Sequence, residues 1–232
     1  MAVATVCAIA ILVVYQLDIV VRLKADHRTA TGEQLQIELP DRSIATLNTK
    51  SAIAVSFDGM ARKVWLLDGE AFFQIQPDRD RPFLVEGQQI VSRAVGTKFL
   101  VRRQSNEIRV TVVEGIVELA STEGGWEPIQ LTAGQQTAVD SHVMGPVREV
   151  DVQSATAWLR GRLVFENLPL TEVIDELRRY HRGVIVIWGP TVGDIRVSGS
   201  YTLTDPDEIL TTLAQTLPIH MARLGSRVVA LF

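Results

Sequence analysis

The sequence predicts a mainly β chain that ends in a small α+β domain and begins with an apolar anchor helix. Apolar and polar residues alternate from Gln34 to about Asp140, as they do in half-buried strands. After residue 156 the apolar residues recur at helical spacing between strand-like segments, and an apolar run fills residues 2–15. We therefore expect an anchor helix (1–23), a linker (24–32), an all-β domain (33–140), a connector (141–156) and an α+β domain (157–232).

The all-β domain is predicted from short alternating segments that end at turn signals. The clearest alternate over residues 35–39, 53–57, 71–75 and 108–112, and Asp58-Gly59 and Glu114-Gly115 follow two of them. No helical stripe of useful length interrupts this region. The pattern is typical of a sandwich, a barrel or a solenoid-like stack and does not distinguish among them.

The C-terminal region carries two helix patterns. Apolar residues from Leu170 to Tyr180 follow helical spacing, and Pro169 is tolerated in the first turn. Asp205 is a suitable N-cap for a second helix, with Pro206 at its first position. Strand-like segments occupy residues 184–188, 195–201, 219–223 and 227–231. With a strand before the first helix, the predicted order is β-α-β-β-α-β-β.

The apolar run near the start has more than one interpretation. A membrane-spanning helix needs roughly 20 apolar residues, and this run is also compatible with a signal-peptide core or a buried helix. We expect a membrane anchor. Arg22, Lys24 and Arg28 follow it, and the positive-inside rule alone would place these residues in the cytoplasm.

Composition excludes several classes of function. A chain of 232 residues with 47% hydrophobic and 22% charged residues is expected to fold, and a net charge of −4 argues against a nucleic-acid partner. Cys7 is the single cysteine, so neither an intramolecular disulfide nor a cysteine metal site can form. The four histidines are scattered, and no hydrolase or phosphate-loop motif occurs. We expect no enzyme of a known class, no cofactor and no metal.

Ordered strings along the chain resemble the FecR family of envelope regulators. The strings that resemble the FecR domain are Gly32–Ile53, Leu66–Gly87, Ala94–Arg102, Val110–Leu119 and Leu131–Gln136. Trp158–Tyr180 and Val197–Leu217 resemble the C-terminal domain of these regulators, which is related to the short N-terminal domain of secretins and TonB-dependent transporters. The resemblance covers nearly everything after residue 23.

This resemblance implies a single-pass inner-membrane protein whose residues after the anchor lie in the periplasm. The implied partners are the signalling domain of an outer-membrane TonB-dependent transporter, commonly one for iron chelates, and envelope proteases that cleave the anchor region. An extracytoplasmic-function sigma factor would be bound by a cytoplasmic module that is missing from this sequence or separately encoded. The alternative is an envelope assembly protein that uses the same domains without signalling.

The resemblance also implies a possible chemical site at Gly96-Thr97. Some FecR-type regulators cut themselves at the matching bond when the threonine hydroxyl attacks the preceding carbonyl carbon. Gly96 admits unusual backbone angles, and Thr97 supplies the nucleophile. The alternative interpretation is a tight turn that leads into a strand.

Aromatic residues of the C-terminal domain are candidate partner-binding anchors, because aromatics dominate interface hot spots. The candidates are Trp158, Phe165, Tyr180, Trp188 and Tyr201. The alternative is that most of them belong to the core. The charged segment Pro77–Pro82 is predicted to be a solvated loop between strands.

Overall fold

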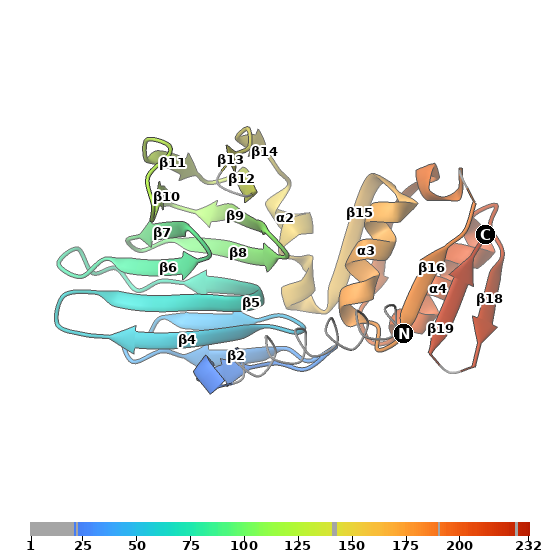
Figure 1. The fold of residues 1–232 in the computed structure, drawn as a ribbon, viewed down its shortest axis with the longest axis horizontal. Coiled ribbons are helices and arrows are strands. Elements are labelled where there is room, and N and C mark those ends of the chain that lie inside the picture. The colour runs from blue at the N-terminus through green and yellow to red at the C-terminus, as the bar shows by residue number, and fades with distance from the viewer. Residues whose placement is uncertain (1–20, 22, 141–142, 190, 226) are drawn as a thin grey trace, which may run out of the picture. The chain divides into compact units, whose positions relative to one another are not determined.

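A computed structural model describes residues 21, 23–140, 143–189, 191–225 and 227–232, which divide into two compact units (Figure 1). Unit 1 contains the described residues up to Thr29 and Gln34–Glu149; unit 2 contains Ala30–Glu33 and Val150–Phe232. The expected anchor helix over residues 1–23 lies almost wholly outside the described residues. Within the described ranges, no helix is both long and apolar enough to cross a membrane.

Unit 1 is built from one curled sheet, so the prediction of an all-β domain is confirmed. Its strands are β1 (His27–Arg28), β2 (Leu35–Glu38), β3 (Ile44–Leu47), β4 (Ala52–Phe57), β5 (Arg62–Gln74), β6 (Phe83–Gly87), β7 (Ile90–Ala94), β8 (Lys98–Gln104), β9 (Glu107–Glu114), β10 (Ile116–Ser121), β11 (Ile129–Thr132), β12 (Gln135–Asp140), β13 (Val143–Met144) and β14 (Arg148–Glu149). The main path runs β11-β10-β7-β6-β5-β8-β9-β12-β13.

The long strand β5 joins the two halves of this sheet. Its first half pairs with β4 and β6, and its second half pairs with β3 and β8. Side chains from both halves meet in one apolar core, where the Phe73 ring lies 5.9 Å from that of Phe83 and 5.4 Å from that of Phe99. Curling therefore buries one face of every long strand without a second sheet.

The predicted linker is partly a strand of this sheet. His27 and Arg28 form β1 against β4, and an Asp26 carboxylate oxygen accepts a hydrogen bond of 2.7 Å from the Val55 amide. Thr29 is buried, and its hydroxyl donates to the Asn48 carbonyl. A composition of small polar residues signals a loop, but here those side chains satisfy the sheet's backbone groups.

The predicted connector also carries structure. Its strands β13 and β14 both pair with β12. The short helix α2 (Val152–Ala155) follows, and the Asp151 carboxylate caps it by accepting from the amides of Gln153 and Ser154. Hydrogen bonds from the Ser154 hydroxyl and these amides lower the pKa of Asp151 below its usual range.

Unit 2 has the predicted order β-α-β-β-α-β-β after a short 3₁₀ turn, η1 (Ala157–Arg160). Its elements are β15 (Arg162–Pro169), α3 (Leu170–Tyr180), β16 (Val184–Ile187), the 3₁₀ turn η2 (Val192–Asp194), β17 (Arg196–Thr202), α4 (Pro206–Thr216), β18 (Met221–Leu224) and β19 (Val228–Leu231). One sheet is β15-β17 and the other is β16-β19-β18. Asp205 caps α4 by accepting from the Asp207 amide at 2.8 Å, as its sequence position predicted.

Candidate functional site

The three-stranded sheet of unit 2 has one buried face and one apolar exposed face. Along β16, Ile185 is buried while Val184 and Val186 are exposed. Trp188 continues the alternation just beyond the strand, with its amide donating to the Leu231 carbonyl at 2.8 Å and 75% of the residue exposed. The period of two thus directs apolar side chains to both faces of this strand.

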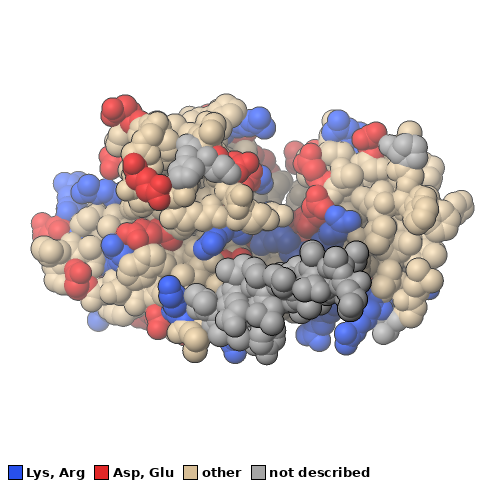
Figure 2. Space-filling view, in the orientation of Figure 1, with Lys and Arg blue, Asp and Glu red and all other residues tan. Residues whose placement is uncertain are grey.

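The neighbouring strands extend the exposed face. Val228 lies opposite Val184 and Leu224, and Ala230 lies opposite Val186 and Ala222. Ile185, Val229 and Leu231 point the other way, into the core formed with α3 and α4. We call this set the apolar face, and it comprises the exposed Val184, Val186, Trp188, Leu224 and Phe232 and the half-buried Ala222, Val228 and Ala230. Figure 2 shows few charged side chains over β18 and β19.

The apolar face ends at an unpaired strand edge. Among the described strands, β16 pairs only with β19, and this pairing is parallel. A strand edge offers unpaired amides and carbonyls to an added strand, and its alternate side chains give such pairing specificity. An exposed apolar patch beside an open edge is therefore a surface suited to binding another protein.

The structure separates the aromatic residues that the sequence suggested as anchors. Trp188 lies on the apolar face, but Trp158, Phe165 and Tyr180 are buried, so we remove these three from the binding surface. Tyr201 is half-buried with its ring 5.8 Å from that of Phe165, and burial raises the pKa of its hydroxyl. Tyr201 thus belongs mainly to packing around the core.

Sequence reasoning missed most of the apolar face. Val184, Val186, Leu224 and Phe232 are aliphatic or terminal residues that a search for aromatic anchors does not select. A signal was present in the string VIVIW over residues 184–188, which is apolar at every position although the strand needs only one buried face. Such a run predicts either a strand buried on both sides or an exposed binding face.

Thr97 lies just before β8 and has an unusual environment. It is only 3% exposed, and its hydroxyl oxygen has no hydrogen-bond partner among the described residues. Buried hydroxyls are normally paired, so an unpaired one invites an explanation. The Thr97 carbonyl, by contrast, accepts from the Ile75 amide at 2.9 Å, which fixes the backbone on the C-terminal side of the Gly96-Thr97 bond.

The Gly96-Thr97 segment is confined on two sides. Gly96 has a φ of +66°, and a Cβ placed there would lie 3.0 Å from the Pro77 ring. Gly115 has a φ of +86°, and a Cβ there would lie 2.8 Å from the Thr97 methyl group. Both glycines are therefore required by backbone conformation and by close approach. The turn predicted from the sequence is present, and it holds a buried nucleophile whose hydroxyl is unpaired among the described residues.

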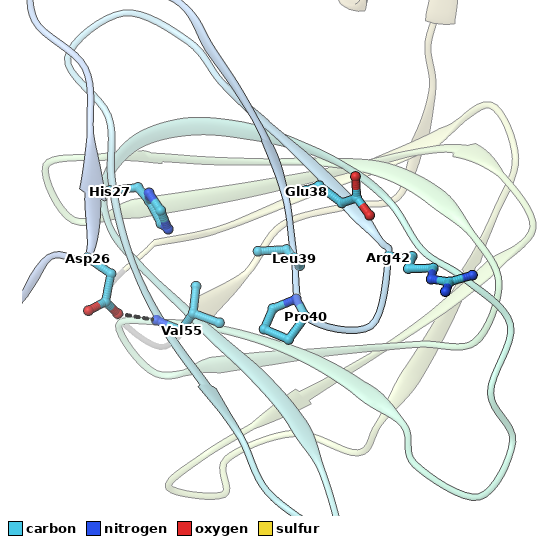
Figure 3. A pocket seen from close by; sticks show the side chains of 7 residues that line it. All are labelled: Asp26, His27, Glu38, Leu39, Pro40, Arg42 and Val55. Carbon is cyan, nitrogen blue, oxygen red and sulfur yellow. Dashed lines mark hydrogen bonds between the residues drawn. The ribbon is translucent and has the colours of Figure 1, made fainter.

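A polar hollow of about 610 Å³ on unit 1 is lined by side chains of both charges (Figure 3). Asp26, His27, Glu38 and Arg42 line it, together with Leu39, Pro40 and Val55. The Asp26 carboxylate already accepts from the Val55 amide, as the dashed line in Figure 3 shows. Its acidic and basic groups do not converge on a nucleophile, so this hollow offers no catalytic arrangement.

A cavity of about 790 Å³ in unit 2 contains the buried His181. The His181 Nδ1 atom accepts from the Gly183 amide at 2.9 Å, and its Nε2 atom lies 3.7 Å from an Asp207 carboxylate oxygen. Asp207 also pairs with Arg223 at 3.1 Å. These contacts join the end of α3 to the start of α4 and serve the packing of the module. Among the described residues, no group of acidic, histidine or cysteine side chains could hold a metal ion.

Comparisons with known proteins agree with this two-unit architecture. The family description "FecR protein" matches residues 25–118, and "FecR, C-terminal" matches residues 162–230. The chain therefore belongs to the FecR family. No protein with a curated description matches it.

Solved structures give the same relationship. Two crystal structures of a proposed anti-sigma factor from Parabacteroides distasonis ATCC 8503, at 1.65 Å and 2.50 Å resolution, are similar to this chain. Their sequences are 26% and 27% identical to that of this chain, and the TM-scores are 0.76 and 0.75. Each match covers 89% of this chain and 97% of the other.

Proposed function

We propose that this chain is the envelope-facing part of a sigma-factor regulator that receives its signal from an outer-membrane TonB-dependent transporter. Membership of the FecR family supports this role, as does the similarity to a proposed anti-sigma factor over 89% of the chain. The observation that carries the receiving step is the apolar face of unit 2, with the open edge of β16 beside it.

In this proposal the chain is held in the inner membrane by residues 1–23, with both units in the periplasm. The sigma factor is of the extracytoplasmic-function type and is the cytoplasmic partner of this relay. The transporter is one for iron chelates, and envelope proteases act on the anchor region once the signal has been received. Family membership supports the sigma-regulator role, and the other roles are those that the resemblance to FecR-type regulators implies.

The apolar face has the physical character of a docking surface. When a partner removes exposed apolar side chains from water, binding is favoured by roughly 25 cal/mol per Å² of buried apolar area. Trp188 supplies the large, rigid anchor that hot spots favour, and Leu224 lies on the same face two strands away. The partner we assign to this face is the transporter's signalling domain, which can add a strand at β16.

A charge on this face tests the proposal. In an envelope crosslinking experiment, Trp188→Asp and Leu224→Asp should each lower recovery of the transporter by about tenfold. The reason is that the interface would have to bury an unpaired carboxylate, and the free-energy cost of burying that charge exceeds the gain from burying the remaining apolar surface. Met60→Asp is the matched control, since Met60 is 82% exposed but lies on unit 1. That variant should recover the transporter at the wild-type level.

The same experiment separates the proposal from its alternative. Recovery of secretion or wall-assembly proteins, with no transporter, would favour an envelope assembly protein and contradict the relay. Equal recovery of the transporter by all three variants would show that the apolar face is not where it binds.

The environment of Thr97 supports a second function, self-cleavage at Gly96-Thr97. The Thr97 hydroxyl oxygen would bond to the Gly96 carbonyl carbon while the carbon–nitrogen bond breaks and the hydroxyl proton passes to the Thr97 nitrogen. Water would then hydrolyse the ester, leaving a carboxylate on Gly96 and a free amine and restored hydroxyl on Thr97. The specific support is a buried hydroxyl with no hydrogen-bond partner among the described residues.

Substitution of the nucleophile tests self-cleavage directly. Thr97→Ala should leave the chain intact, because no hydroxyl remains to attack, whereas Thr97→Ser should still be cut. Thr111 is a matched control, since it is equally buried but lies within β9. Intact-mass spectra should show cutting in Thr111→Ala. Equal cutting of wild type and Thr97→Ala would show that the Thr97 hydroxyl is not the nucleophile and would contradict self-cleavage by this route.

A further inference from the structure

The guanidinium of Arg62 is a fully buried charge at the start of β5. Its Nη1 atom lies 2.6 Å from an Asp41 carboxylate oxygen, and its CZ atom lies 5.5 Å from the centre of the Phe83 ring. The same Asp41 carboxylate accepts hydrogen bonds from the Ser43 hydroxyl and the Ser43 amide. A buried arginine is tolerated only when it is paired and its donors are used.

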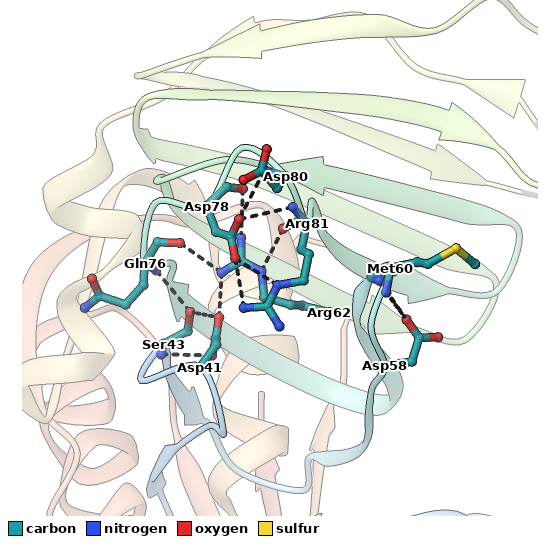
Figure 4. A network of polar contacts seen from close by, with 10 residues as sticks. Asp41, Ser43, Asp58, Met60, Arg62, Gln76, Asp78, Asp80 and Arg81 are labelled. Atoms are coloured by element: carbon teal, nitrogen blue, oxygen red, sulfur yellow. Dashed lines mark hydrogen bonds and ion pairs between the residues drawn. The ribbon is translucent and has the colours of Figure 1, made fainter.

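The remaining donors of Arg62 bind the backbone of the loop that contains Pro77. Nη1 donates to the Gln76 carbonyl and Nε to the Arg81 carbonyl, each at 2.9 Å, and Nη2 makes a longer contact of 3.4 Å with the Asp78 carbonyl. Figure 4 shows Arg62 between Asp41 and the loop residues. This planar, five-donor group can hold several carbonyls at once, which a lysine cannot.

Gln76 is held from both sides. Its carbonyl accepts from Arg62, and its amide donates to the Ser43 hydroxyl at 3.0 Å. Pro77 follows directly, and its ring occupies the space where a side chain on Gly96 would lie. One residue earlier, the Ile75 amide donates to the Thr97 carbonyl. The segment that Arg62 fixes is therefore the segment that confines the Gly96-Thr97 bond.

We infer that Arg62 is a positioning residue for the cut between Gly96 and Thr97, an inference that rests on the self-cleavage proposed above. Arg62 does not touch the reacting atoms. Through Gln76 it fixes Pro77 against Gly96, and this contact keeps the peptide in the conformation that places its carbonyl carbon before the Thr97 hydroxyl. Reactions of this intramolecular kind lose about 100-fold in rate when the reacting groups move by roughly 1 Å.

Two variants test the positioning role at different points. Arg62→Lys keeps a charge for Asp41 and the Gln76 carbonyl but loses the bond to the Arg81 carbonyl. Pro77→Ala leaves the Arg62 contacts in place and removes the ring beside Gly96. The full-length chain would be made by cell-free synthesis, and loss of the uncut form would be timed by gel. Each variant should cut about tenfold more slowly than wild type.

Stability is separated from positioning by a control and a double variant. Leu119→Ala, in the core of β10, should lower the unfolding midpoint at least as much as Arg62→Lys, yet cut at the wild-type rate. Because both test substitutions act on the same contact, the double variant Arg62→Lys/Pro77→Ala should cut no more slowly than the slower single variant.

The outcomes are distinguishable. If the wild-type chain is cut and both Pro77→Ala and Arg62→Lys are cut at the wild-type rate, the positioning role is overturned and self-cleavage is left intact. Slowing of Leu119→Ala by as much as Arg62→Lys would reduce Arg62 to a structural residue. A folded wild-type chain that is never cut would overturn both self-cleavage and the role of Arg62.

Discussion

At the scale of the residue, the backbone of Gly69 sets the course of the longest strand. Gly69 lies where β5 passes from its pairing with β4 to its pairing with β3, and its φ is +77°. A Cβ placed there would lie 2.3 Å from the Ser51 hydroxyl oxygen and 2.5 Å from the Lys50 carbonyl oxygen. Only glycine fits both this backbone conformation and the close approach of Lys50 and Ser51. The course of β5, and with it the curl of the sheet, therefore depends on a glycine at this position.

We therefore expect Gly69→Ala to be strongly destabilising. A left-handed alanine costs about 1–2 kcal/mol, and overpacking a filled site costs about 1–3 kcal/mol more, for a loss of roughly 2–5 kcal/mol in the free energy of unfolding. Gly59→Ala is the control, because a Cβ placed at Gly59 would have no neighbouring atom within 4 Å. Urea titration of both variants would decide, and a Gly69→Ala variant as stable as Gly59→Ala would contradict this account.

Single residues also show why part of the candidate site could not be predicted. The string Pro77–Pro82 was predicted to be a solvated loop from its charges, and Arg81 does pair with Asp78 at the surface. The loop carbonyls, however, bind Arg62, which lies 14 positions before Gln76 and 19 positions before Arg81 in the sequence. No local pattern marks an arginine as a buried centre, because the pairing with Asp41 exists only after the chain folds.

At the scale of the element, prediction succeeded where periodicity was long. The apolar stripe of α3 and the cap of α4 were predictable from local sequence, since both depend on neighbouring residues. The two-residue strands β1, β13 and β14 were not, because a strand this short has no period. Their backbone groups pair with β4 and β12 through contacts between distant segments, which single-sequence patterns do not carry.

Edge strands illustrate a second limit. The apolar run of β16 predicts a strand but does not say which face is covered, since both faces are apolar. Only the pairing order β16-β19-β18 and the position of the helices reveal that Val184, Val186 and Trp188 form the exposed side. Of the aromatic candidates, Trp188 is exposed whereas Trp158 and Tyr180 are buried, and the sequence could not separate them because hydrophobic residues are favoured both in cores and at interfaces.

At the scale of the whole molecule, the order of strands in unit 1 determines what self-cleavage would release. A cut after Gly96 divides the chain into residues 1–96 and 97–232, between β7 and β8. The first piece contributes the central strands of this part of the sheet, β7-β6-β5. The second piece contributes the strands on both sides of them, β10 and β11 next to β7 and β8 and β9 next to β5. The two pieces are therefore interleaved, with hydrogen-bonded borders at β7-β10 and at β5-β8.

This interleaving predicts that the cut pieces stay together as one folded body. Separation would break two complete strand borders and expose the apolar core of unit 1, which Phe73, Phe83 and Phe99 share across the β5-β8 border. Size-exclusion chromatography of the cut protein in native buffer should give one peak that contains both pieces, and urea should separate them only at concentrations that unfold uncut Thr97→Ala. Free pieces in native buffer would mean that the borders are weaker than their hydrogen bonding indicates. A co-eluting pair would mean that the cut chain keeps the fold of unit 1 in native buffer.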